Sequence, residues 1–242
     1  KKGGNGSRNY GLQLSKGEFV NWIDSDDRID ENFILEKVKA FNENTDVVIS
    51  KTVIMNEQNE IIKKEDRTNF TDNLLDDFIT LKVSWYISDP LWRKSFLLKN
   101  NLKFSEELLK GQDRDFHIRI LTLKPRIIII DKYLYFYRNN LNSVSNLNSV
   151  SVSYSYLKGS LERNKLILKH EVKNTTKLFL LKQQLRTYSA LHKQPKIHNM
   201  YGQVFKDLFV FTFSNIVVLF KFLLAVVAFK FFNKGDKILK SM

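Results

Sequence analysis

Residues 16–27 have the sequence KGEFVNWIDSDD, in which an apolar segment leads directly into three carboxylates. Phe19–Ile23 is rich in aromatic and β-branched residues, which predicts a β-strand. Open α/β sheets place their ligand sites at the carboxyl ends of their strands. We therefore expect Asp24, Asp26 and Asp27 to lie at a ligand-binding edge of a sheet.

Helical and strand patterns alternate on both sides of this stretch. Apolar spacing predicts helices over residues 7–16, 32–42, 72–82, 90–99 and 113–123. Short runs of apolar and aromatic residues predict strands over 46–55, 127–130 and 133–137. The alternation predicts an α/β fold.

The acidic cluster suits a divalent cation. Three carboxylates within four residues repel one another, and Mg²⁺ or Mn²⁺ would offset that repulsion while neutralising a diphosphate leaving group. A plain alternative is a solvated turn that caps the following helix. The surrounding motifs decide between the two interpretations.

The helix before the strand contains Arg8-Asn9-x-Gly11-Leu12, and its order and spacing relative to the acidic cluster resemble glycosyltransferase family 2 enzymes of the GT-A fold. Ser7 stands where that family usually has alanine. The resemblance extends over about residues 3–145 through four further motifs: Trp92–Leu97, Leu102–Glu106, Gln112-Asp113-x-Asp115-Phe116, and Tyr135-x-Tyr137-Arg138 with Ser143–Ser145.

The resemblance implies a role for each candidate residue. Asp113 would be the catalytic base, and Asp26 with Asp24 would hold Mn²⁺ or Mg²⁺. Four residues would bind the nucleotide sugar: Arg8, Asn9, Asp24 and Asp27. Alternatives from the residues themselves remain open, because Asp113 could be a helix N-terminal acid, Arg8 a surface ion-pair partner and Asn9 a local cap.

The lack of cysteine and the position of the first motifs limit the kinds of site and the extent of the domain that we expect. The sequence has no cysteine, so disulfides, thiolate zinc sites and cysteine nucleophiles are excluded. The chain starts at Lys1, and the first strand and base-binding loop of such enzymes would lie upstream. We therefore expect a GT-A α/β domain over residues 1–140 that is incomplete at its N-terminus. His117 lacks a partner in the sequence and is expected to be structural.

The C-terminal third differs in charge and pattern. A Ser/Asn-rich linker is expected over 141–155, followed by a basic helical region over 156–242 with a helix from about 156 to 192. Residues 158–242 hold 16 Lys and Arg against four Asp and Glu. The apolar helix expected over 203–232 could lie on a membrane, span it or pack as an ordinary core helix.

The resemblance implies an inverting glycosyltransferase of cell-surface polysaccharide synthesis. Its donor would be a nucleotide-diphosphate sugar and its acceptor a glycan or a lipid-linked molecule. We expect it in the cytoplasm, peripheral at the inner face of the plasma membrane, because lysines beside an apolar run suit an anionic membrane better than nucleic acid. The alternative is a catalytically silent fragment that acts as a membrane-associated interaction module.

Overall fold

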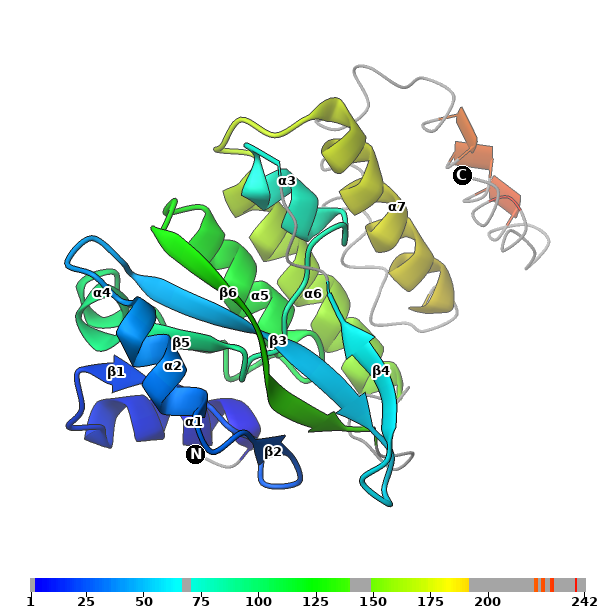
Figure 1. Cartoon of the computed structure of the whole chain (residues 1–242). Helices are drawn as coiled ribbons and strands as arrows, with labels where there is room; N and C mark the ends of the chain where they lie inside the picture. The colour runs from blue at the N-terminus through cyan, green and yellow to red at the C-terminus, as the bar shows by residue number, and fades with distance from the viewer. Residues whose placement is uncertain are drawn as a thin grey trace. The chain divides into compact units, whose positions relative to one another are not determined.

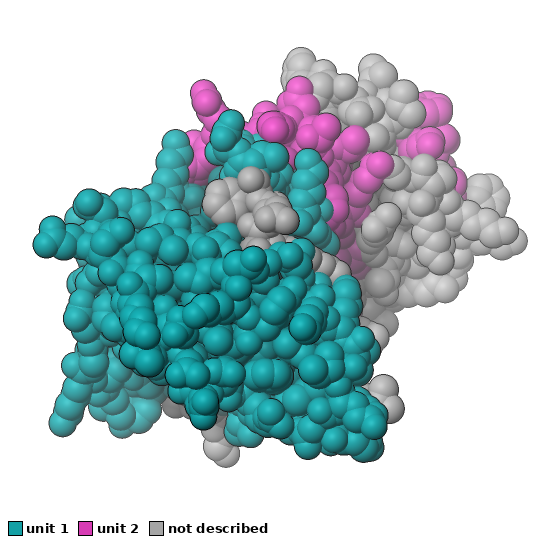
Figure 2. All heavy atoms as spheres, in the orientation of Figure 1, with its two compact units in different colours: residues 1–106, 112–147 teal, residues 107–111, 148–242 magenta. Residues whose placement is uncertain are grey.

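The structure is a computed structural model of the 242-residue chain. It describes residues 3–66, 71–139 and 149–191, and near the C-terminus 220, 221, 223, 224, 227, 228 and 238. The chain forms two compact units, shown in different colours in Figure 2. The first unit comprises residues 1–106 and 112–147, and the second comprises 107–111 and 148–242.

The first unit is built from helices and strands that alternate along the chain. Its helices are α1 (Gly4–Leu14), α2 (Phe33–Ala40), α3 (Leu74–Ile79), α4 (Lys94–Lys99) and α5 (Gln112–Leu121). Its strands are β1 (Phe19–Val20), β2 (Arg28–Ile29), β3 (Val47–Met55), β4 (Ile61–Glu65), β5 (Pro90–Arg93) and β6 (Ile127–Arg138). The predicted α/β class is confirmed.

The strands form one mixed sheet in the order β1-β5-β3-β6-β2, with β4 paired to the second half of β3. The pair β3 and β6 is parallel, and the other pairs are antiparallel. Val47, Val48 and Ile49 are fully buried, as expected for a β-branched run in a central strand. Because β1 ends at Val20, the acidic loop follows at one end of the sheet.

Helices cover both faces of this sheet. In Figure 1, α2 lies in front of the strands and α5 lies behind them. Phe33 of α2 packs against Leu134 and Tyr135 of β6, while Phe116 of α5 packs edge-on to Trp92 of β5. The two layers bury the central strand β3, whereas β2 and the first four residues of β4 are exposed.

Residues 90–99 form a strand and a helix, so the prediction of one helix there is wrong for its first turn. Leu91 and Trp92 in β5 pair with Val48 and Val47 of β3, and both are buried. Pairing of this stretch with the edge of the central strand β3 therefore outweighed its helical spacing of apolar residues. Similarly, the two strands predicted between 127 and 137 are one continuous strand, β6.

The second unit contains α6 (Val150–Ile167) and α7 (Asn174–Leu191). Helix α6 begins six residues before the predicted start, because the Ser149 hydroxyl accepts a hydrogen bond from the Val152 amide at 3.3 Å and caps it. The predicted helix over 156–192 is interrupted between Ile167 and Asn174. Most of the 203–232 segment lies outside the described residues.

A short segment of the second unit lies between two parts of the first unit in sequence. Residues 107–111 pack on α6, where the Ser155 hydroxyl accepts from the Leu109 amide at 3.0 Å and donates to the Glu107 carbonyl at 2.9 Å. A Cβ at Gly159 would overlap the end of the Leu108 side chain, so a larger residue there would require Leu108 to move. Gln112 and Asp113 follow this segment directly.

Candidate active site

Arg8 connects two predicted site carboxylates that are far apart in sequence. Its guanidinium donates to Asp24 at 2.9 Å and to Asp113 at 3.1 Å. The Trp22 indole donates to the Arg8 carbonyl at 3.1 Å, and the guanidinium lies 5.4 Å from the Phe104 ring centre. The fold therefore brings Arg8, Asp24 and Asp113 together from a helix, a strand end and a second helix.

The environment of Asp113 changes its affinity for protons. Burial raises the pKa of the Asp113 carboxyl, the Arg8 guanidinium lowers it, and the nearby Asp24 carboxylate raises it further. A raised pKa makes the carboxylate a stronger proton acceptor when it is ionised. The position and electrostatics of Asp113 suit a general base.

Asp27 is held by strand β6. One of its carboxylate oxygens accepts from the Tyr135 hydroxyl and the other from the Arg138 amide at 2.7 Å. Burial raises the pKa of the Asp27 carboxyl, while these two hydrogen bonds oppose the shift. The Arg138 guanidinium donates to the Asp26 carbonyl at 2.7 Å and to the Glu57 carbonyl at 3.1 Å.

Tyr135 and Arg138 are thus anchors of the acidic loop, a role that the sequence analysis missed. The signal was the run Tyr135-x-Tyr137-Arg138, which the resemblance included without assigning a contact. Its partner could not be read from the sequence because Asp27 and Arg138 are 111 residues apart.

The acidic loop offers two carboxylates to a cation. The Asp26 side chain is exposed, and within the described residues no hydrogen bond or ion pair engages its carboxylate; Asp24 uses only one oxygen for Arg8. Asp27 has both oxygens occupied. No group of three or more His, Cys, Asp or Glu side chains arranged for a metal occurs in the described parts of the chain. Two carboxylates fit Mg²⁺ or Mn²⁺ of the kind that takes its other ligands from water and substrate phosphates.

Asn9 is engaged within the first unit. Its side-chain amide donates to the Phe104 carbonyl at 3.0 Å and to the Glu106 carboxylate at 3.1 Å, and accepts from the Phe104 amide at 2.8 Å. These bonds tie α1 to the segment 104–106. Asn9 thus has a clear structural contact, and its predicted role in donor binding stays a prediction.

His117 lies in an aromatic cluster. Its ring is 1% exposed and lies within 5.7 to 6.2 Å, between ring centres, of four aromatic rings: Phe78, Trp85, Trp92 and Phe116. Burial lowers the pKa of the His117 imidazole to about 3, so the ring is neutral near neutral pH. The geometry agrees with the predicted structural role.

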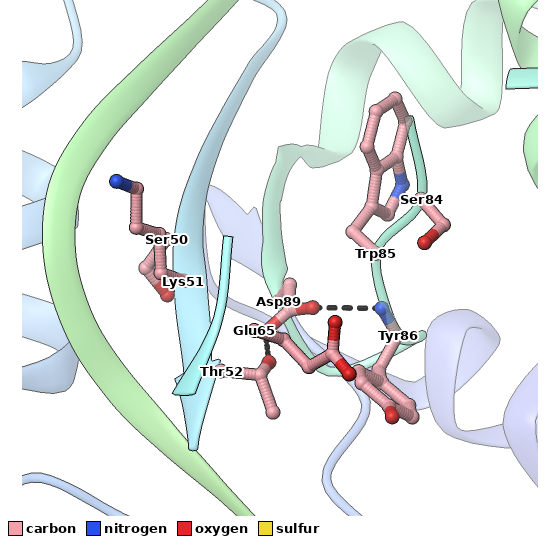
Figure 3. A pocket seen from close by; sticks show the side chains of 8 residues that line it. All are labelled: Ser50, Lys51, Thr52, Glu65, Ser84, Trp85, Tyr86 and Asp89. Carbon is pink, nitrogen blue, oxygen red and sulfur yellow. Dashed lines mark hydrogen bonds between the residues drawn. The ribbon is translucent and has the colours of Figure 1, made fainter. Parts of the chain in front are cut away.

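A small polar cavity lies beside β3, and the sequence analysis did not identify it. Figure 3 shows its lining, which includes Thr52, Trp85, Tyr86 and Asp89, and its volume is about 210 Å³. The buried Asp89 carboxylate accepts from the Thr52 hydroxyl and from the Tyr86 amide at 2.7 Å. Lys37 of α2 is also buried and donates to the Asp89 carbonyl at 2.6 Å.

Comparisons with known proteins agree with this fold. The crystal structure of Staphylococcus aureus TarS residues 1–349 with UDP-GlcNAc superimposes with a TM-score of 0.57 at 19% identity, covering 86% of this chain and 61% of that chain. The fold is therefore of the GT-A type. Residues 1–103 match the model of glycosyl transferase family 2, the family that the sequence motifs resemble.

Two curated relatives with similar sequences are named as glycosyltransferases. The poly(ribitol-phosphate) β-N-acetylglucosaminyltransferase TarP of S. aureus is 29% identical over 204 residues, which cover 81% of this chain and 62% of TarP. The glycosyltransferase EpsJ of Bacillus subtilis is 23% identical over 150 residues, which cover 58% of this chain and 43% of EpsJ. The chain thus spans about half the length of these relatives.

Proposed function

We propose that the protein is an inverting glycosyltransferase that moves a sugar from a nucleotide-diphosphate donor to a hydroxyl of a glycan or lipid-linked acceptor in cell-surface polysaccharide synthesis. The observation that supports this most is the link from Asp24 through Arg8 to Asp113. It joins the acidic loop, which suits a diphosphate-bound cation, to a partly exposed carboxylate whose raised pKa suits proton transfer.

Asp113 is the proposed base. Its carboxylate takes the proton of the acceptor hydroxyl while the acceptor oxygen forms a bond to the anomeric carbon of the donor sugar. The bond from that carbon to the diphosphate breaks on the opposite face, so the configuration inverts. The raised pKa of Asp113 increases the driving force for this proton transfer.

Asp26 and Asp24 are the proposed ligands of Mn²⁺ or Mg²⁺. When bound, the cation supplies charge neutralisation to the departing diphosphate. Asp27 supports them by fixing the loop to β6 and contributes to the nucleotide-sugar site from there. Arg8 supplies a guanidinium whose donors suit phosphate oxygens, and Asn9 keeps the helix that carries Arg8 in place.

UDP-GlcNAc is the first donor to test, since the structure of TarS similar to this fold contains it. The full-length protein should release UDP from a panel of UDP-sugars with Mn²⁺, measured by coupled assay with and without chelator. Asp26→Ala and Asp113→Asn should lose turnover while retaining their far-UV circular dichroism. Absence of turnover by the full-length wild type with every donor would instead favour the silent interaction module.

We also propose that the basic C-terminal region holds the enzyme at the cytoplasmic face of an anionic membrane. The excess of lysine and arginine after residue 158 supports this. Within the described residues, no helix has the length and apolar character needed to cross a bilayer. Flotation with anionic liposomes, with and without residues 200–242, tests the proposal, and equal flotation of the two proteins would refute it.

A further inference from the structure

The segment 107–111 belongs to the second unit, although the residues on both sides of it belong to the first, and Figure 2 colours it accordingly. Gln112 begins α5 directly after the segment, and the proposed base Asp113 is the second residue of that helix. The segment and the base are thus separated by a single residue. A displacement of the segment would therefore be passed to Asp113 by the chain itself.

Helix α6 holds this segment by hydrogen bonds and by packing. The Ser155 hydroxyl of α6 donates to the Glu107 carbonyl and accepts from the Leu109 amide. Between these two residues, the Leu108 side chain is 4% exposed and fills the space beside Gly159 of α6, where an added Cβ would lie 2.2 Å from its Cδ1. Both kinds of contact come from α6, so the position of the segment depends on that helix.

The end of the segment that leads to the base is restricted by its backbone and by an aromatic ring. Gly111 has a φ of +74°, which residues with a side chain rarely adopt. A Cβ at Gly111 would also lie 2.8 Å from Cε2 and 3.1 Å from Cδ2 of the Tyr156 ring of α6. The chain therefore turns into α5 beside this ring, and the direction in which it enters α5 depends on Gly111 and Tyr156.

The residues just before the segment are held by α1, the helix that carries Arg8. The Asn5 side-chain amide of α1 donates to the Ser105 carbonyl at 2.7 Å. Because α1 holds the start of this stretch and α6 holds the part that leads to the base, the separation between Arg8 and Asp113 depends on both helices. Arg8 donates to Asp113 at 3.1 Å, near the upper end of the usual range of about 2.7–3.2 Å. A displacement of Asp113 by about 1 Å would break this bond.

We propose that Tyr156 and Gly111 are positioning residues, which set the separation between Asp113 and the Arg8 guanidinium. The second unit thereby takes part in transfer, in addition to the membrane contact proposed above. The inference rests on the proposed function only for the role of Asp113 as the base. The placement of Asp113 beside Arg8 is a property of the chain that can be measured without substrate.

Two variants of the full-length protein change the contact in different ways. Tyr156→Leu removes the ring, and Gly111→Ala adds a Cβ where the ring and the positive φ oppose it. Tyr154→Leu is the matched control, because it makes the same change two residues earlier, about 200° around the helix. Each protein is compared with and without Arg8→Gln. Carbon-13 NMR at pH 8 follows the Asp113 carboxyl, whose chemical shift responds to the neighbouring guanidinium.

Arg8→Gln should move the Asp113 signal in wild type and by the same amount in Tyr154→Leu. At least half of that movement should be lost in Tyr156→Leu and in Gly111→Ala, because Asp113 has left the reach of Arg8. Tyr156→Phe keeps the ring and should retain the full movement. A role in stability alone would lower the unfolding temperature of the variants and leave the movement as in wild type, and that result would overturn the proposal. Equal loss in Tyr154→Leu, or no movement in wild type, would overturn it as well.

UDP release by the full-length protein is the second readout. We expect kcat to fall about 10- to 100-fold in Tyr156→Leu and Gly111→Ala with an unchanged KM for the donor, since a misplacement of about 1 Å can cost roughly 10² in rate. No UDP release by wild type would refute the proposed function, whereas the NMR comparison would still decide whether α6 positions Asp113. If Tyr156→Leu does not fold, Gly111→Ala and Tyr156→Phe give the same comparison.

Discussion

The acidic loop carries the proposed metal ligands, and the segment 107–111 leads to the proposed base, Asp113. The two are held by different parts of the chain. The acidic loop, residues 24–27, is fixed by Tyr135 and Arg138 of β6 within the first unit. The segment 107–111 is fixed by α6 of the second unit. The metal side of the site (residues 24–27) and its base side (Asp113 with segment 107–111) therefore have separate anchors, although Arg8 bonds to both.

Among the variants that separate the two sides of the site, Asp113→Asn should have the largest effect on turnover. An amide cannot take the proton of the acceptor hydroxyl, so turnover should fall by roughly 10² to 10⁴. Binding of UDP with Mn²⁺, measured by calorimetry, should change little, because the acidic loop keeps its own anchors. Equal losses of turnover and of UDP affinity would contradict the separation of the two sides.

Tyr135→Phe should disturb the metal side. It leaves the half-buried Asp27 carboxylate without its hydroxyl donor, and such supporting contacts are worth about 10- to 100-fold in metal affinity or activity. Activation by Mn²⁺ should therefore require higher metal concentrations. Tyr133→Phe is the control, since it removes the same atom two residues earlier on β6. A matching change in that variant would assign the effect to the strand and not to Asp27.

Ser155→Ala should disturb the base side with a smaller effect. It removes the acceptor of the Leu109 amide and the donor to the Glu107 carbonyl, at about 1 kcal/mol for each hydrogen bond. We expect faster amide hydrogen exchange in residues 107–111 and a severalfold lower kcat with unchanged KM for the donor. Ser153→Ala, two residues earlier on α6, should exchange like wild type. Wild-type exchange in Ser155→Ala would show that α6 does not hold this segment.

The smallest expected effect is a change in the titration of Asp113. Arg8 lowers the pKa of this carboxyl and Asp24 raises it, so Arg8→Gln should raise the pKa and Asp24→Asn should lower it. Carbon-13 NMR of the Asp113 carboxyl across pH 3–8 measures both shifts without an activity assay. Shifts in the same direction in the two variants would contradict the geometry of the Arg8 bridge.

Local sequence determined much of the fold and of the candidate site. The β-branched run at 47–49 and the acidic cluster can each be interpreted from neighbours within a few residues. The motif spacing around Arg8 also pointed to the family whose model matches residues 1–103. Where sheet pairing competed with local spacing, as at Leu91 and Trp92, the sequence alone predicted the wrong element.

Only the tertiary structure decided how the site is assembled. The Arg8 bridge joins residues 105 positions apart, and the anchor of Asp27 by Arg138 spans 111 positions. Likewise, segments that are distant in the chain line the cavity at Asp89, and residues 107–111 contact the distant helix α6. The sequence predicted which side chains carry the chemistry, whereas their partners, burial and pKa shifts arise from long-range packing that no local pattern encodes.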